Sequence, residues 1–181
     1  MFPLILRYGT VAGLIVAIPM VWRMLAAQPG DGNPLGGMLV GYLVMIVALT
    51  AVFVGVKAYR DKVLGGAIRF VPALAVGLGI SAVAGIFYVV AWEISMAFSA
   101  FDFIAFWKTS MIDAAKARGA TGAQLEKAIA EADSFATWYR NPLYRMPITF
   151  VEIFPVGVLV SLISAAILRN SRVLPARAPM G

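Results

Sequence analysis

Four long apolar segments are the dominant feature of this chain of 181 residues. A membrane-crossing helix needs about 20 mostly apolar residues, because the hydrocarbon layer is about 30 Å thick and each helical residue rises about 1.5 Å. Segments that meet this requirement run over residues 4–26, 35–56, 71–98 and 148–168. The sequence therefore predicts an all-α fold, with a single membrane domain over residues 1–181 built as an integral membrane bundle of four transmembrane helices.

Composition supports a membrane protein and narrows its chemistry. Apolar residues make up 61% of the chain and charged residues 13%, whereas a water-soluble domain is typically about half apolar. The chain has no cysteine and no histidine, which excludes thiolate and imidazole metal sites, disulfides, and Cys or Ser-His-Asp nucleophiles. We therefore expect no catalytic residues, no metal site and no cofactor.

The first apolar segment has a second interpretation. Arg7, the apolar run from Tyr8 to Trp22 and the small pair at residues 26–27 resemble a cleavable signal peptide. Arg23 lies just before that cleavage point, and three further spans follow it. These two features favour a permanent first span.

The basic residues predict the orientation. Lysine and arginine next to short loops stay on the cytoplasmic side. The loop over residues 28–34 contains neither residue, so both termini should be cytoplasmic in a bacterial inner membrane. The chain has a net charge of +6, and we expect its partner to be anionic lipid headgroups rather than nucleic acid. The cytoplasmic basic residues are then Lys57, Arg60, Lys62 and Arg69 in the second loop and Arg169, Arg172 and Arg177 in the tail.

Residues 99–146, between the third and fourth spans, predict an external helical hairpin. A first helix over residues 103–118 should end at Gly119. Residues 121–124 have the spacing of a capping box for a second helix that ends near Tyr139. The hairpin would either cap the bundle or dock a partner. Four aromatic residues of this segment suit the membrane interface: Trp107, Trp138, Tyr139 and Tyr144.

Small residues recur at every fourth position in each span. Lipid provides little hydrophobic drive between helices, so close backbone approach through such stripes is a main source of association. The stripes should pack this bundle or, alternatively, a homo-oligomer or a complex with another membrane protein. They comprise Gly9, Gly13 and Ala17; Gly37 and Gly41, then Ala51 and Gly55; Ala73, Gly77, Ser81 and Gly85; and Gly157, Ser161 and Ala165.

Three ionisable residues fall within the apolar runs. Helical rise places Arg23, Glu93 and Glu152 at a similar depth near the outer ends of their spans. An unpaired carboxylate in hydrocarbon costs several kcal/mol, so we expect the three side chains to form one polar cluster. The cluster would be either an Arg23 bridge that fastens three helices or a site that binds protons or cations.

Two signatures carry a family resemblance. The sequence FVGVKAYRD at residues 53–61, followed by residues 65–70, and the sequence NPLYRMPITFVEIFPVG at residues 141–157 resemble a bacterial membrane family known as domain of unknown function 4199. Residues 92–93 fit as well, and the resemblance covers residues 35–168. It implies a small multi-span membrane protein and no specific activity.

Three functions follow as hypotheses. The lack of reactive side chains beside abundant packing motifs favours a non-enzymatic scaffold or accessory protein of the cell envelope. A small proton- or cation-coupled transporter or channel would use Glu93 and Glu152, although no inverted repeat relates the two halves. A lipid-modifying enzyme with two carboxylates as acid and base has no nucleophile or metal motif to support it.

Overall fold

The computed structural model describes residues 1–26 and 34–176, without the side chains of residues 34–38. This part of the chain consists of helices and contains no strand, which confirms the all-α prediction. The predicted loop at residues 28–33 and Arg177 lie outside the described residues. The helices are α1 (Phe2–Ala26), α2 (Pro34–Lys62), α3 (Phe70–Phe98), α4 (Phe103–Ala117), α5 (Ala123–Tyr139) and α6 (Pro142–Leu168).

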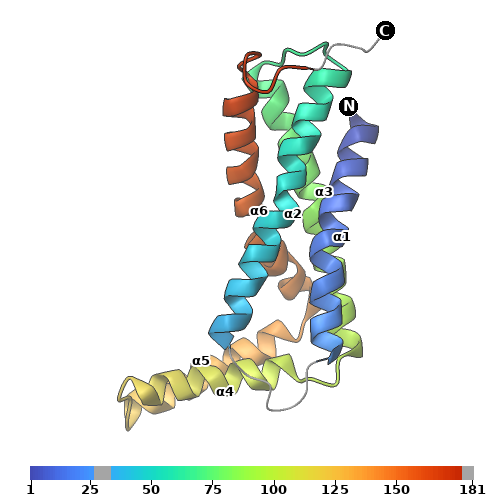
Figure 1. The fold of residues 1–181 in the computed structure, drawn as a ribbon. Coiled ribbons are helices and arrows are strands. Elements are labelled where there is room, and N and C mark those ends of the chain that lie inside the picture. The colour runs from blue at the N-terminus through green and yellow to red at the C-terminus, as the bar shows by residue number, and fades with distance from the viewer. Residues whose placement is uncertain (27–33, 177–181) are drawn as a thin grey trace.

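Four of these helices are long and apolar enough to cross a membrane: α1, α2, α3 and α6. They lie side by side as a bundle, with the N-terminus and the end of α6 at the same end (Figure 1). α3 is at its centre, because α1 and α6 both pack against it along much of their length. The four long apolar helices of the predicted bundle are therefore present in the fold.

Two spans extend beyond their apolar runs. α2 continues to Lys62, because its last turns carry charges that pair with one another: Lys57 Nζ lies 2.5 Å from Asp61 Oδ2. α6 begins six residues before the predicted start, at a point where the Asn141 side chain accepts from Leu143 N at 3.0 Å and Pro142 fits the first turn. Pro147 is consequently inside α6, together with Pro155.

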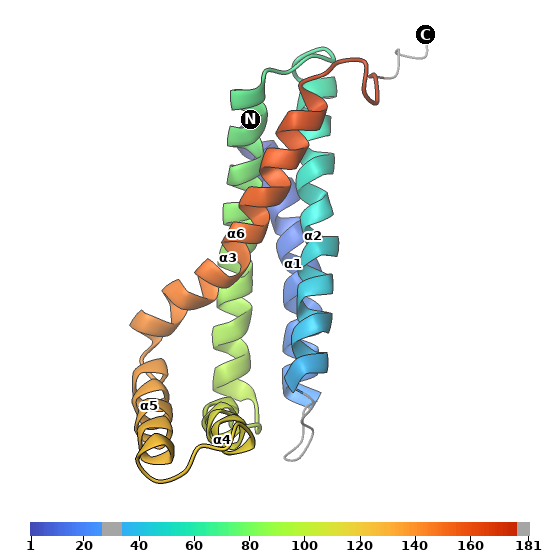
Figure 2. The same cartoon turned by 90° about the vertical axis from the view of Figure 1, so that its left-hand side faces the viewer.

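α4 and α5 pair as a hairpin at the end of the bundle opposite the N-terminus (Figure 1). The hairpin projects sideways, roughly across the bundle axis (Figure 1), and the view in Figure 2 looks nearly along α4. Gly119 ends the first helix with a φ of +83°, as predicted. The predicted capping box is wrong, because the cap residue of α5 is Gly122 and no side chain caps the helix.

Candidate functional site

An ion pair joins the start of α6 to α3. Arg145 Nε donates to Glu93 Oε1 at 2.8 Å, and Arg145 Nη2 donates to Glu93 Oε2. Both side chains are largely buried, with exposed fractions of 8% for Arg145 and 19% for Glu93. A two-point contact of this kind fixes the relative orientation of the two groups as well as their distance.

The same arginine also holds the hairpin. Its Nη1 donates to the carbonyl oxygen of Tyr139, the last residue of α5, at 3.1 Å, and its guanidinium lies 5.8 Å from the centre of the Tyr139 ring. Burial raises the pKa of the Tyr139 phenol, so this hydroxyl is protonated at neutral pH. Arg145 therefore links α3, α5 and α6 at one point.

Aromatic rings surround this junction. Trp92 meets Phe103 edge to face at 4.8 Å between ring centres, and Tyr139 stacks on Phe135 at 5.1 Å. The Trp92 ring nitrogen is buried without a hydrogen-bond partner in the described part of the chain. Low polarity around Arg145 and Glu93 strengthens their attraction and raises the cost of removing either one.

Glu152 has a different environment from Glu93. The Tyr88 hydroxyl donates to Glu152 Oε2 at 3.2 Å, and no lysine or arginine among residues 1–26 and 34–176 forms an ion pair with Glu152. Tyr88 is buried, whereas the Glu152 side chain is exposed on the surface of an apolar helix. The structure thus separates the two acids into a paired one and an unpaired one.

The prediction of one cluster bridged by Arg23 is corrected. Arg23 is exposed, and it forms no ion pair within the described ranges. Arg145 takes the predicted place of Arg23 beside Glu93, although the apolar pattern puts Arg145 in the external segment of residues 99–146. The signal that could have found Arg145 is the Asn141-Pro142 pair, a helix start that carries Arg145 into the first turns of α6.

A second buried arginine lies at the other end of the bundle. Arg60 is fully buried and donates from Nε to Asp61 Oδ1 at 2.7 Å, from Nη1 to the Val173 carbonyl at 2.9 Å and from Nη2 to the Leu174 carbonyl. The chain after α6 is thereby fastened to the end of α2. In the sequence, Arg60 stands out only as one of the basic residues that predict the orientation, and no pattern indicates this contact.

Most of the predicted packing residues lie at close helix contacts. A Cβ added to Gly77 would lie 2.8 Å from Ser161 Cβ, and one added to Gly157 would lie 2.6 Å from Ser81 Cβ. The Ser81 hydroxyl is 3.2 Å from the Gly157 carbonyl. A Cβ added at any of four other stripe glycines would come similarly close to a side chain of another helix. The pairs are Gly9 with Val83, Gly13 with Phe87, Gly55 with Ile80 and Gly85 with Phe150.

The second span contains the exception. Nothing lies within 4 Å of a Cβ added to Gly41, so its predicted role in packing this bundle is wrong. Gly37 lies where only the helix backbone is described. The remaining members, Ala17, Ala73 and Ala165, are buried, and Ala51 is half-buried.

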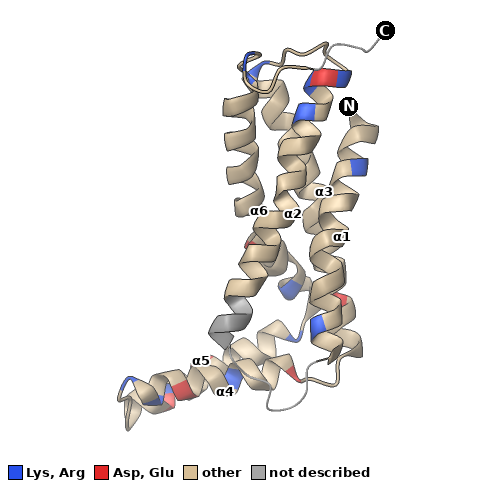
Figure 3. Ribbon diagram, viewed as in Figure 1, with Lys and Arg blue, Asp and Glu red and all other residues tan. Residues whose placement is uncertain are grey.

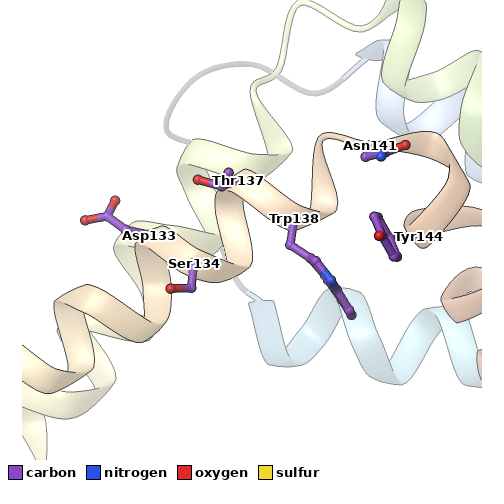
Figure 4. A pocket seen from close by; sticks show the side chains of 6 residues that line it. All are labelled: Asp133, Ser134, Thr137, Trp138, Asn141 and Tyr144. Carbon is purple, nitrogen blue, oxygen red and sulfur yellow. The ribbon is translucent and has the colours of Figure 1, made fainter.

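A pocket of about 540 Å³ lies at the base of the hairpin (Figure 4). The Trp138 ring stacks on the Tyr144 ring at 5.6 Å between centres and 11° between planes. The lining residues come from α5 and the start of α6: Asp133, Ser134, Thr137, Trp138, Asn141 and Tyr144.

Comparison with protein families gives a match over most of the chain. A family model described as "Protein of unknown function (DUF4199)" matches residues 7–170. The match is wider than the resemblance at residues 35–168, because it includes most of the first span. No curated protein and no solved structure matches the chain.

Proposed function

The chain belongs to the DUF4199 family of proteins of unknown function, and we propose that it is a non-enzymatic scaffold or accessory protein of a bacterial inner membrane. Its bundle would hold the α4–α5 hairpin in a fixed position at one membrane surface. The proposal rests on Arg145, which binds Glu93 of α3 and the Tyr139 carbonyl of α5 from its place in α6.

The use of the buried charges supports this role. An enzyme or a transporter needs polar side chains that are free to meet a substrate. In this chain Arg145 and Glu93 are engaged with each other, and Arg60 is engaged with the tail. These contacts join parts of the fold and leave the hairpin as the element that projects from it (Figure 1).

The orientation is part of the proposal. Basic residues gather at the bundle end that holds the N-terminus, although the hairpin carries charges of both signs (Figure 3). By the preference of lysine and arginine for the cytoplasmic side, the termini face the cytoplasm, close to anionic headgroups, and the hairpin is external. The close packing of α1 on α3 through Gly9 and Gly13 supports a permanent first span rather than a cleaved signal peptide.

Reporter fusions test the orientation. Alkaline phosphatase fused at Gly119 should be active and a fusion at Gly65 inactive, because the enzyme folds only outside the cytoplasm. Activity at Gly65 alone would reverse the topology.

Site-specific crosslinking tests the scaffold role. A photoreactive amino acid at Lys127 or Glu131, both exposed on the hairpin, should capture the same membrane-protein or envelope partner in native membranes. Arg145→Leu should abolish the capture, because the hairpin then loses its fastening. Arg140→Leu is the matched control, since Arg140 is exposed and makes no ion pair in the described ranges.

Capture that persists in Arg145→Leu would show that a fixed hairpin is not needed and would contradict the proposal. Equal capture from Val47, an exposed residue of α2, would indicate random collisions in the membrane and would contradict it as well.

One observation favours a second candidate function, a proton- or cation-coupled transporter or channel. Glu152 is an ionisable group in an apolar helix with a tyrosine hydroxyl instead of a cation beside it. Such residues commonly mark proton or ion pathways. In the described part of the chain, the two pockets at the hairpin are lined by α4, α5, the turn between them, Asn141 and Tyr144 at the start of α6. Glu152 lines neither pocket.

Proteoliposomes that contain a pH-sensitive dye distinguish the two functions. A transporter should show proton uptake that Glu152→Gln abolishes and Glu126→Gln, a change on the exposed face of α5, preserves. Uptake equal to that of protein-free liposomes would exclude proton transport under these conditions.

A further inference from the structure

Glu152 lies in an exposed stripe of α6 that is otherwise apolar. Four residues at spacings of four, three and four share one face of the helix: Ile148, Glu152, Pro155 and Leu159. All four are exposed, Leu159 by 57%. The first half of α6 also leans away from α2 (Figure 2), which agrees with the exposure of this face.

The acid is far from both ends of its helix. α6 begins at Pro142 and ends at Leu168, so Glu152 is about 15 Å from one end and about 24 Å from the other, at about 1.5 Å per residue. The hydrocarbon layer is about 30 Å thick. Glu152 therefore lies within this layer, away from the lipid headgroups at either surface.

Two acceptors at this face lack a donor. The Tyr88 hydroxyl donates to Glu152 Oε2 at 3.2 Å, whereas Oε1 has no donor in residues 1–26 and 34–176. Pro155 has no N–H group, so the carbonyl of Val151 lacks the donor that a regular helix would supply four residues ahead. Val151 and Pro155 are both exposed, so this carbonyl opens on the same side as the carboxylate.

Lipid chains cannot satisfy these groups. Ionisable residues in membrane spans almost always face the interior of a bundle or a wet cavity, or pair with an opposite charge. Glu152 is exposed, lines neither pocket at the hairpin, and pairs with no lysine or arginine in the described part of the chain. A partner that covers it must bring a positive charge and several donors, which a lysine or arginine side chain supplies.

A second copy of the chain does not present such a charge at this depth. Arg145 of α6 is already engaged in an ion pair. Arg7 is within the first two turns of α1 and Arg23 is in its last turn. The basic residues of α2 lie in its last two turns, and α3 has none. In a copy that is inserted in the same direction, these cations stay near the membrane surfaces.

We propose that the face of α6 from Ile148 to Leu159 binds a transmembrane helix of another protein, and that this helix carries a lysine or arginine at the depth of Glu152. The cation lies at the Glu152 carboxylate and the Val151 carbonyl, and apolar side chains of the partner pack on Ile148 and Leu159. This contact rests on the proposed scaffold role and specifies the chemistry of the partner.

Designed transmembrane peptides test the charge requirement. The full chain, with a photoreactive amino acid at Leu159, is reconstituted with a leucine–alanine helix that has lysine, glutamine or glutamate at its centre. The lysine peptide should give about fivefold more crosslinked product than the glutamine peptide, as expected for a polar contact between helices in a membrane. The glutamate peptide should give the least.

Glu152→Gln should remove the preference for lysine, because the amide still accepts from the Tyr88 hydroxyl but has no charge. Glu126→Gln, the same change at an exposed acid of α5, is the matched control and should keep it. Equal crosslinking of the three peptides would show that this face only meets lipid and would overturn the proposal. A preference for glutamine over lysine would overturn it as well, because Glu152 would then be a neutral hydrogen-bonding group.

Photocrosslinking in native membranes tests the natural contact. Ile148 and Leu159 should capture the same membrane protein, with a lysine or arginine in the middle of one span. Glu152→Lys should abolish the capture, and a glutamate in place of that basic residue of the partner should restore it. Capture of a second copy, capture of a protein without such a residue, or no capture at either site would contradict the proposal.

The hairpin crosslinks separate this contact from the scaffold role itself. Capture from Lys127 or Glu131 without capture from α6 would overturn the α6 contact and leave the scaffold role standing. Capture from α6 that depends on Glu152, without capture from the hairpin, would support the α6 contact and contradict the hairpin as the docking element.

Discussion

Arg145 on α6 contacts both carboxylate oxygens of Glu93 on α3, 52 positions away in the chain. The pair is largely buried, so each charge depends on the other for the interactions that water would otherwise provide. The loss of one partner is therefore more costly than the loss of both.

Arg145→Leu should lower the free energy of unfolding in detergent by about 3–5 kcal/mol, because it leaves Glu93 charged and unpaired. The double change Arg145→Leu, Glu93→Gln should restore much of the loss. Arg140→Leu, which removes an exposed arginine close by, should have little effect. Denaturant titration of purified variants measures all three, and additive single effects would show that the pair is not coupled.

Gly77→Ala and Gly157→Ala should each destabilise the bundle by about 1–3 kcal/mol, since the new methyl group would overlap a serine on the facing helix. Gly41→Ala is the matched control, because the same change on α2 meets no atom within 4 Å. Melting temperatures in one detergent are sufficient for the comparison. Helix propensity alone favours Ala over Gly at all three sites, so equal losses of stability would show that overlap with the facing serines is not the cause.

Arg60→Gln should release the segment that follows α6. The substitution removes the donors to the Val173 and Leu174 carbonyls, which hold the backbone just after the Arg172–Val173 bond. Trypsin should therefore cleave after Arg172 several-fold faster in this variant than in the parent. Arg69→Gln, which changes an exposed arginine in the loop between α2 and α3, should leave the rate of cleavage after Arg172 unchanged.

The sequence predicted the spans well because apolar length is set by membrane thickness, independently of the fold. α1 and α3 begin and end within two residues of their predicted limits. The hairpin helices were also predicted, because Gly119 ends the first one through a positive φ. The errors at α2 and α6 are related, because both helices continue through charged residues that have partners. Lys57 pairs with Asp61 within α2, and Arg145 of α6 pairs with Glu93 of α3. Hydropathy does not register such pairing.

The polar contacts were harder to predict. Helical rise fixes the depth of a residue and leaves its direction around the helix open, so Arg23, Glu93 and Glu152 could share a depth without meeting. The partner of Glu93 depended on where α6 begins. The contact of Arg60 with Val173 and Leu174 depended on the path of the chain after α6, for which the sequence contains no periodic signal.

The acids of the two apolar helices α3 and α6 provide the last prediction, because the same substitution should affect them differently. Glu93→Gln leaves Arg145 buried without its counter-charge and should destabilise the protein by about 3 kcal/mol or more. Glu152→Gln removes no ion pair, and the new amide can still accept from the Tyr88 hydroxyl, so stability should change by less than about 1 kcal/mol. Tyr88→Phe should likewise have a small effect, because it removes one neutral donor. Denaturant titration at neutral pH gives the three values under identical conditions. A large loss of stability in Glu152→Gln would show that this carboxylate is ionised and bound to a cation that stabilises the fold. Both acids would then be structural, and the distinction between Glu93 and Glu152 would be wrong.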